Sequence, residues 1–174
     1  FLKEMPVYRD PFGETIQFFA EPTQLTSEQK EVMTELKPAL TARKYSPFLL
    51  HGITGSGKTE IYLQATKQTL TAGRTVLVMV PEIALTTQLE AHFISRFGDQ
   101  IALIHSGLSK GERFDQWQRI ANKEAKIVIG ARSAVFAPLD DPGLIIVDEE
   151  HDGAYKQEDG LRYNGRDLAI LRGT

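Results

Sequence analysis

Apolar residues along the chain gather into short continuous runs, and helical patterns lie between them. Five runs have the length of a strand, at 48–51, 76–80, 101–105, 127–130 and 144–148. Each run is apolar at nearly every position, which is typical of strands buried on both faces of a parallel sheet. The pattern therefore predicts five parallel strands.

The intervening segments carry the spacing of amphipathic helices. A first helix is predicted over 27–40, because Thr26 and Gln29 have the spacing of a capping box. A second capping box, formed by Ser109 and Glu112, introduces the last of four helices. The apolar positions of these helices are Val32, Met33 and Leu36; then 61–70; then Leu85, Leu89, Phe93 and Phe97; then Phe114, Trp117 and Ala121.

This alternation of strand and helix predicts an α/β fold with a doubly wound, mainly parallel sheet and helices on both faces. Ligands of such sheets gather at the carboxyl ends of the strands. Residues 1–24 hold three prolines and one glycine without a helical period, so we interpret them as a linker or extension from a preceding domain. The domain itself is predicted over 25–174. Because the chain begins with Phe1, we interpret it as a segment of a longer protein.

Composition narrows the class of protein. The chain has 174 residues, of which 41% are hydrophobic and 25% charged, and no run approaches the ~18 apolar residues of a membrane span. It has no cysteine, which excludes disulfides and thiolate metal sites and favours a cytoplasmic location. The net charge of −3 means that any contact with nucleic acid must come from a local patch of Lys and Arg.

The segment 52–59 reads GITGSGKT and matches the phosphate-loop pattern GxxxxGK[ST], between a predicted strand and a predicted helix. Glycines let consecutive backbone N–H groups turn inward around phosphate, and the helix N-terminus adds positive charge. Lys58 is expected to neutralise the β and γ phosphates, and the Thr59 hydroxyl to ligate Mg²⁺. The predicted ATP-binding residues of this loop are Gly52, Thr54, Gly55, Ser56, Gly57, Lys58 and Thr59.

A second ATP motif follows the predicted strand 144–148. Asp148 is placed to hold the water shell of the metal, and Glu149 to orient or deprotonate the attacking water. His151 has two open interpretations: it relays the state of the γ phosphate, or it satisfies a local hydrogen bond.

The sequence DEEH at 148–151 resembles motif II of superfamily 2 helicases. Four more segments carry related patterns: LTSEQ at 25–29 is similar to the adenine-reading Q motif, VPEIALTTQ at 80–88 to motif Ia, GARSA at 130–134 to motif Ib, and HSGLSKGER stands at 105–113. In combination these segments resemble the PriA family of bacterial replication-restart DNA helicases over about residues 25–172.

The resemblance implies the first of two RecA-like P-loop NTPase domains, with ATP and Mg²⁺ as cofactors. It also implies 3′ to 5′ movement on single-stranded or forked DNA, and primosome and single-strand-binding proteins as partners. The zinc-binding cysteines of the family, and the second RecA-like domain with its arginine finger, would lie outside this chain. The segment alone would then be nearly inactive as an ATPase, since an arginine finger is worth ~10³ to 10⁵ in rate.

Family resemblance also assigns contacts to DNA. The polar ends of motifs Ia and Ib are expected to meet phosphate, and the aromatic and basic segment 152–166 is expected to couple DNA binding to ATP hydrolysis. The candidate residues are Thr87, Gln88, Arg132, Ser133, Tyr155, Lys156, Arg162, Tyr163 and Arg166. The alternative for 152–166 is a surface loop whose tyrosines pack back on the sheet. For Gln29, adenine reading and helix capping are both open.

Three other functions fit parts of the pattern. An RNA helicase of the DEAD or DEAH type shares the core, but the DEEH motif and the segment after it resemble the PriA family. A nucleotide-dependent binding module without hydrolysis has no need of Glu149. A P-loop kinase needs a lid and an acceptor site, and the sequence has no such insertion between its strands.

Overall fold

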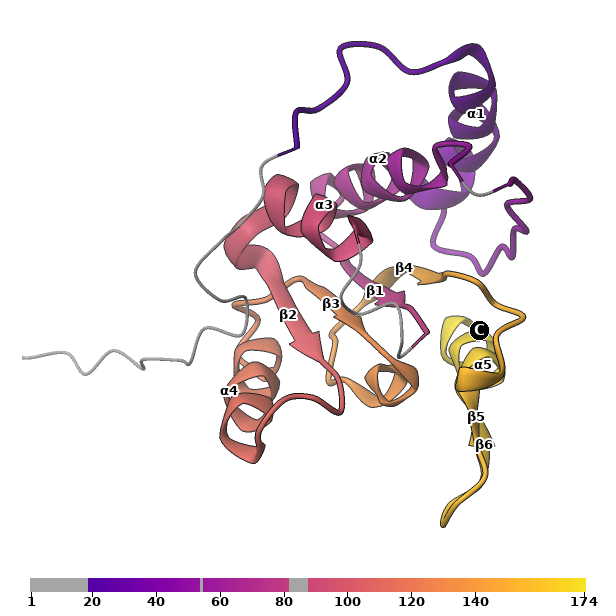
Figure 1. The fold of residues 1–174 in the computed structure, drawn as a ribbon. Coiled ribbons are helices and arrows are strands. Elements are labelled where there is room, and N and C mark those ends of the chain that lie inside the picture. Colours follow the sequence, from indigo (N-terminus) through magenta and orange to yellow (C-terminus); the bar gives the residue numbers. More distant parts are fainter. Residues whose placement is uncertain (1–18, 54, 82–87) are drawn as a thin grey trace, which may run out of the picture.

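Four parallel strands form the central sheet in the part of the chain that the structure describes. The computed structural model describes residues 19–53, 55–81 and 88–174 (Figure 1). The strands are β1 (Thr75–Met79), β2 (Ile101–Ile104), β3 (Ile127–Gly130) and β4 (Pro142–Val147), in the order β2-β3-β1-β4. Nearly every residue of β1, β2 and β3 is buried, and the three strands pair in parallel, which confirms the prediction for these three apolar runs.

Helices cover both faces of this sheet. Val76 and Val78 of β1 pack in one cluster with residues of α2 (Lys58–Thr71) and α3 (Gln88–Phe97). Leu77 and Met79 pack in a second cluster with residues of α4 (Lys110–Ala121) and α5 (Gly165–Gly173). Figure 1 shows α2 and α3 above the sheet and α4 and α5 below it. The predicted doubly wound fold is confirmed.

Local signals in the sequence located the helix starts accurately. In α1 (Ser27–Thr41) Thr26 and Gln29 form the predicted capping box, and in α4 Ser109 and Glu112 form the second one. Each box satisfies backbone N–H groups that the first helical turn would leave unpaired. Of the apolar positions predicted for α3, Leu89, Phe93 and Phe97 are buried, and Leu85 lies outside the described residues.

The predicted strand at 48–51 is wrong. This segment forms no strand in the structure, and the side chains of Phe48 and Leu49 are 54% and 78% exposed. An apolar run becomes a strand only where a neighbour accepts its backbone hydrogen bonds. Within the described residues, no strand pairs with 48–51, and β4 pairs with β1 alone.

The predicted inner face of α4 is also wrong. Phe114 and Trp117 point to solvent, 60% and 40% exposed, while Gln116 and Ile120 face the sheet. The Gln116 Oε1 atom accepts a hydrogen bond from the Leu103 backbone N–H at 3.3 Å, on the outer strand β2. A buried amide is tolerated there because a sheet edge offers N–H donors that need an acceptor.

The segment 152–166, predicted as a loop, holds secondary structure. A short 3-10 helix, η4 (Gly153–Tyr155), leads into the antiparallel pair β5 (Lys156–Gln157) and β6 (Tyr163–Asn164), and α5 follows. We call residues 156–164 the hairpin; it projects away from the sheet (Figure 1). A 3-10 helix, η3 (Arg132–Phe136), follows β3.

Most of the predicted linker, residues 1–18, lies outside the described part of the chain, so the boundary at residue 25 stays a prediction. Among residues 19–53, 55–81 and 88–174, no helix is long and apolar enough to cross a membrane.

Gly130 lies at the end of β3, where the ends of β2 and β3 approach each other closely. A Cβ atom there would lie 2.2 Å from the Ile104 carbonyl oxygen of β2 and 2.7 Å from the Ala134 Cβ. We therefore expect Gly130→Ala to lower the free energy of unfolding by at least about 2 kcal/mol, because backbone cannot move aside cheaply. Circular dichroism should show a fall in melting temperature of roughly 5 °C.

Gly153→Ala is the matched control, since a Cβ at Gly153 meets nothing within 4 Å. Equal melting temperatures for the two variants would contradict the close approach of β2 and β3.

Candidate nucleotide-binding site

The phosphate loop turns into α2 through two glycines in the left-handed region. Gly55 has φ +78° and Gly57 has φ +86°, a conformation that residues with a Cβ rarely adopt. The Ser56 N–H donates to the Ile53 carbonyl at 3.2 Å and closes the turn. Gly57 caps α2 without a side chain, so the first N–H groups of the helix are left to a ligand.

Lys58 lies inside this loop. Its ammonium donates to the carbonyl oxygens of Gly52 at 2.7 Å and Ile53 at 3.2 Å. An ammonium has three donors and seeks negative charge, so phosphate oxygens are its natural exchange partners. Thr59 follows in the first turn of α2, and Thr54 lies outside the described residues.

Gln29 reaches the same loop from α1. Its Oε1 atom accepts from the Thr26 N–H at 3.0 Å, which completes the capping box, and its Nε2 atom donates to the Gly57 carbonyl at 3.2 Å. A Cβ at Gly57 would lie 2.5 Å from that amide nitrogen. The capping role of Gln29 is confirmed, and it extends to support of the phosphate loop. Adenine reading stays a prediction.

The carboxyl end of β4 places Asp148 beside α2. The Tyr62 hydroxyl donates to Asp148 Oδ1 at 3.0 Å, and the Asp148 N–H donates to the Met79 carbonyl at 2.9 Å. Burial, followed by the charge of Asp148, raises the pKa of Tyr62, so this hydroxyl stays a donor. Asp148 and the phosphate-loop helix therefore meet at one edge of the sheet, as the motifs predicted.

Sequence reasoning missed Tyr62. The signal was its position four residues after Lys58, because side chains at that spacing share one face of a helix.

Glu149 follows in a strained backbone conformation. Its φ is +47°, which is uncommon for a residue with a Cβ, and its side chain is exposed. Non-glycine residues in this region cost about 1 to 3 kcal/mol and cluster at functional sites. The strain turns the chain directly after Asp148, and the Asp152 N–H bonds the Glu149 carbonyl at 2.8 Å.

His151 faces two carboxylates from a largely exposed position. Its Nε2 and Nδ1 atoms lie 3.7 Å from Glu149 Oε2 and from Glu150 Oε2, respectively. Both distances exceed that of a hydrogen bond, so these contacts do not decide between the two interpretations of His151.

The oxygen atoms of Asp148 and Thr59 suit a Mg²⁺ ion that binds together with a nucleotide. Among the described residues, no group of three or more His, Cys, Asp and Glu side chains could hold a metal ion. Mg²⁺ at phosphate sites is bound through one or two carboxylates together with phosphate oxygens and water. Asp148 and Thr59 fit that arrangement.

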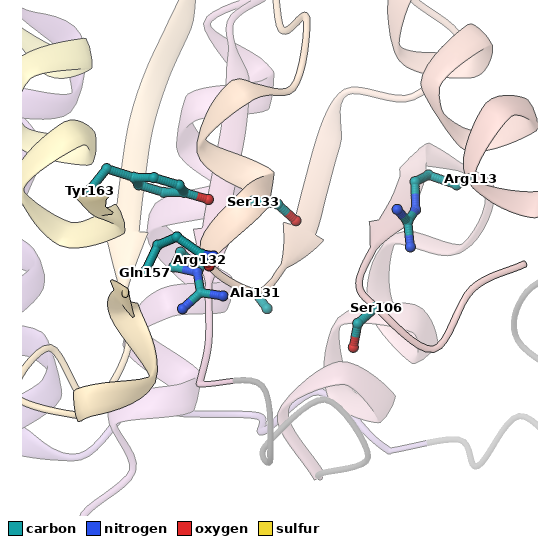
Figure 2. A pocket seen from close by; sticks show the side chains of 7 residues that line it. All are labelled: Ser106, Arg113, Ala131, Arg132, Ser133, Gln157 and Tyr163. Carbon is teal, nitrogen blue, oxygen red and sulfur yellow. The ribbon is translucent and has the colours of Figure 1, made fainter. Parts of the chain in front are cut away.

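A pocket of about 180 Å³ lies at the same edge of the sheet, next to the ends of β2 and β3. Figure 2 shows Arg113 and Arg132 on opposite sides of it, with the hydroxyls of Ser106 and Ser133 between them. Two cations and two hydroxyl groups suit a phosphate group of a nucleic acid backbone. Of these four residues, sequence reasoning selected Arg132 and Ser133 and missed Ser106 and Arg113.

Arg132 has a structural task as well. Its guanidinium donates to the Ala154 carbonyl at 3.3 Å and to the Lys156 carbonyl, and it lies 6.0 Å from the centre of the Tyr163 ring. It thereby fixes the hairpin against the start of η3. Tyr163 is half-buried and meets the Phe136 ring edge-on, with ring centroids 5.2 Å apart.

Tyr155 is a correction to the predicted DNA contacts. Its side chain is only 1% exposed, so no base can stack on it. Its hydroxyl donates to the Asp148 carbonyl at 2.6 Å, and burial is the main cause of its raised pKa. For Tyr155 the alternative interpretation, packing back on the sheet, is the correct one.

The other residues predicted to contact DNA differ in exposure and in their ion pairs. Gln88, Lys156 and Arg162 are exposed. Arg166 pairs with Asp167, with Nη2 and Oδ1 3.0 Å apart. Thr87 lies outside the described residues. A contact with DNA remains a prediction for each of these residues.

Comparison with known proteins decides the family. Residues 22–167 match the family model described as "Type III restriction enzyme, res subunit". The chain belongs to this family.

Within the family, the chain is similar to proteins named replication restart protein PriA. It is 49% identical to the protein from Bacillus subtilis (strain 168) over 95% of this chain and 21% of that protein. It is 46% identical to the Chlamydia muridarum protein, over 92% of this chain and 22% of that protein. It is 48% identical to the Synechocystis protein, over 91% of this chain and 20% of that protein. The chain thus spans about a fifth of the length of these relatives, and the resemblance found from its motifs is confirmed. Its RecA-like fold class is confirmed with it.

The two contacts of Gln29 can be separated by mutation. Thr26→Ala removes only the capping box, whereas Gln29→Ala also removes the amide on Gly57. Thr26→Ala should lower the free energy of unfolding by about 1 kcal/mol, and Gln29→Ala by about 2 kcal/mol because it also loses the bond to Gly57. If Gln29 also reads adenine, only Gln29→Ala should weaken ADP binding, by about tenfold, and reduce the preference for ADP over GDP in calorimetry.

Thr26→Ala serves as the control for loss of the cap. An unchanged ADP affinity and an unchanged preference for ADP over GDP in Gln29→Ala would show that this residue does not read adenine.

Proposed function

We propose that this chain is the ATP-binding motor domain of a superfamily 2 DNA helicase in replication restart, coupling ATP hydrolysis to DNA translocation and unwinding. One observation carries the proposal: the 3.0 Å bond from Tyr62 to Asp148 brings the helix of the phosphate loop and the acidic end of β4 together. Relatives named for replication restart, at 43 to 49% identity, supply the biological setting.

The proposed chemistry divides the work among four residues. Lys58 neutralises the β and γ phosphates, and Thr59 and Asp148 hold Mg²⁺ directly or through its water shell. Glu149 accepts a proton from the attacking water or orients it. The exposed, left-handed position of Glu149 supports this role because it turns the side chain out of the sheet, next to Asp148.

DNA is the proposed second ligand. The pocket between Arg113 and Arg132 suits a backbone phosphate. On the hairpin the exposed Lys156 and Arg162 would each contact a phosphate individually, because the exposed Glu158 and Asp159 balance their charge. Movement in the 3′ to 5′ direction, binding of forks, and primosome and single-strand-binding partners are proposed from the family resemblance. The arginine finger and the family's zinc would come from other parts of a protein of the relatives' length.

Two variants test the catalytic roles in such a longer protein. Lys58→Ala should abolish binding of MgADP in calorimetry, because it removes the cation that faces the phosphates. Glu149→Gln should bind MgADP normally and lower ATP turnover in the presence of single-stranded DNA by at least about 100-fold, because an amide cannot accept the proton.

The neighbouring carboxylate provides the control: Glu150→Gln should leave turnover within about twofold of the parent. Parental turnover in Glu149→Gln would remove Glu149 from the mechanism, and unchanged MgADP affinity in Lys58→Ala would overturn the site assignment. A parent protein that binds MgADP without DNA-stimulated hydrolysis would favour a binding module.

A further inference from the structure

We propose that Tyr62 is a positioning residue, which holds one oxygen of Asp148 so that the other oxygen faces the water shell of Mg²⁺. The proposal rests on the proposed function and adds a residue that neither the motifs nor the family pattern assigned. It concerns the orientation of the carboxylate; the hydroxyl itself is not assigned a contact with the metal or the nucleotide.

The position of Tyr62 in α2 ties it to the phosphate loop. It lies three residues after Thr59 and four after Lys58, so the three side chains share one helix face. Its ring packs against the core cluster that contains Leu63 and Ile146. The ring is thereby anchored to the sheet, and the hydroxyl is fixed in space relative to the loop.

Asp148 is restrained on its backbone from two other directions. Its N–H donates to the Met79 carbonyl at 2.9 Å, and its carbonyl accepts from the Tyr155 hydroxyl at 2.6 Å. With both backbone groups held, rotation of the side chain is the main freedom that remains. The Tyr62 hydroxyl limits that rotation by its 3.0 Å bond to Oδ1.

The chemistry of a carboxylate explains why one fixed oxygen is useful. Each carboxylate has two oxygens and about four lone-pair positions, so a donor on Oδ1 leaves Oδ2 able to accept from water on a metal. Hydrogen-bond partners of this kind orient metal-binding groups, and their loss typically costs about 10- to 100-fold in metal affinity. Tyr62 therefore acts on the metal through Asp148.

The test measures metal dependence of nucleotide binding in the 174-residue chain. ADP affinity is measured by calorimetry across a range of Mg²⁺ concentrations and in EDTA, at a temperature where circular dichroism shows each variant folded. We expect Tyr62→Phe to raise, by about tenfold, the Mg²⁺ concentration that gives half of the maximal gain in ADP affinity. Affinity for ADP in EDTA should stay within about twofold of the parent, because the phosphate loop is intact.

Tyr45→Phe is the matched control, since it also deletes one phenol hydroxyl. Tyr45 is exposed and lies between α1 and the phosphate loop. This variant should leave both measurements unchanged. An unchanged Mg²⁺ midpoint in folded Tyr62→Phe would overturn the proposal. The proposal would also fail if Tyr62→Phe lost as much ADP affinity in EDTA as it loses with Mg²⁺, because the hydroxyl would then act on the nucleotide or the loop.

The parent chain separates this failure from failure of the proposed function. If the parent does not bind MgADP, the proposed function fails and the role of Tyr62 fails with it. If the parent binds with a clear Mg²⁺ dependence that Tyr62→Phe retains, only the positioning role is lost.

Discussion

Hydrogen bonds to Asp148 hold the nucleotide edge of this domain together. The Asp148 side chain is bonded to α2 through Tyr62, and its backbone is bonded to β1 through Met79 and to η4 through Tyr155. Of these three elements, α2 is the phosphate-loop helix, β1 lies inside the sheet, and η4 directly precedes the hairpin. A shift of Asp148 when nucleotide binds would therefore displace each of them, since partly buried hydrogen bonds cost free energy when they break without replacement.

Arg132 continues this connection toward the proposed DNA surface. Its bonds to the carbonyl groups of Ala154 and Lys156 join η3 to η4 and to the first residue of β5, on either side of Tyr155. A second link runs on the other face of the sheet, where Arg96 of α3 binds both carboxylate oxygens of Glu60 at 2.8 and 3.1 Å. Both links connect segments that the motifs place at the nucleotide or the DNA, through side chains that are not themselves assigned to catalysis.

Local sequence signals predicted much of this arrangement. The apolar runs identified the four parallel strands, and the capping boxes and the glycines of the phosphate loop fixed the starts of helices, because these features depend on near neighbours in the chain. The failures depend on distant partners. Segment 48–51 lacks a neighbouring strand among the described residues, Gln116 replaces Phe114 and Trp117 on the inner face of α4, and Tyr155 is buried by its contact with Asp148.

The central claim is that Asp148 connects nucleotide binding to the hairpin, and amide hydrogen exchange of the 174-residue chain tests it most directly. Exchange is compared with and without MgADP, for the parent and for Tyr155→Phe. The account predicts that MgADP changes protection both at 55–62 and at 153–157, and that Tyr155→Phe keeps the first change and loses the second. Changes confined to 55–62 in the parent would contradict the account.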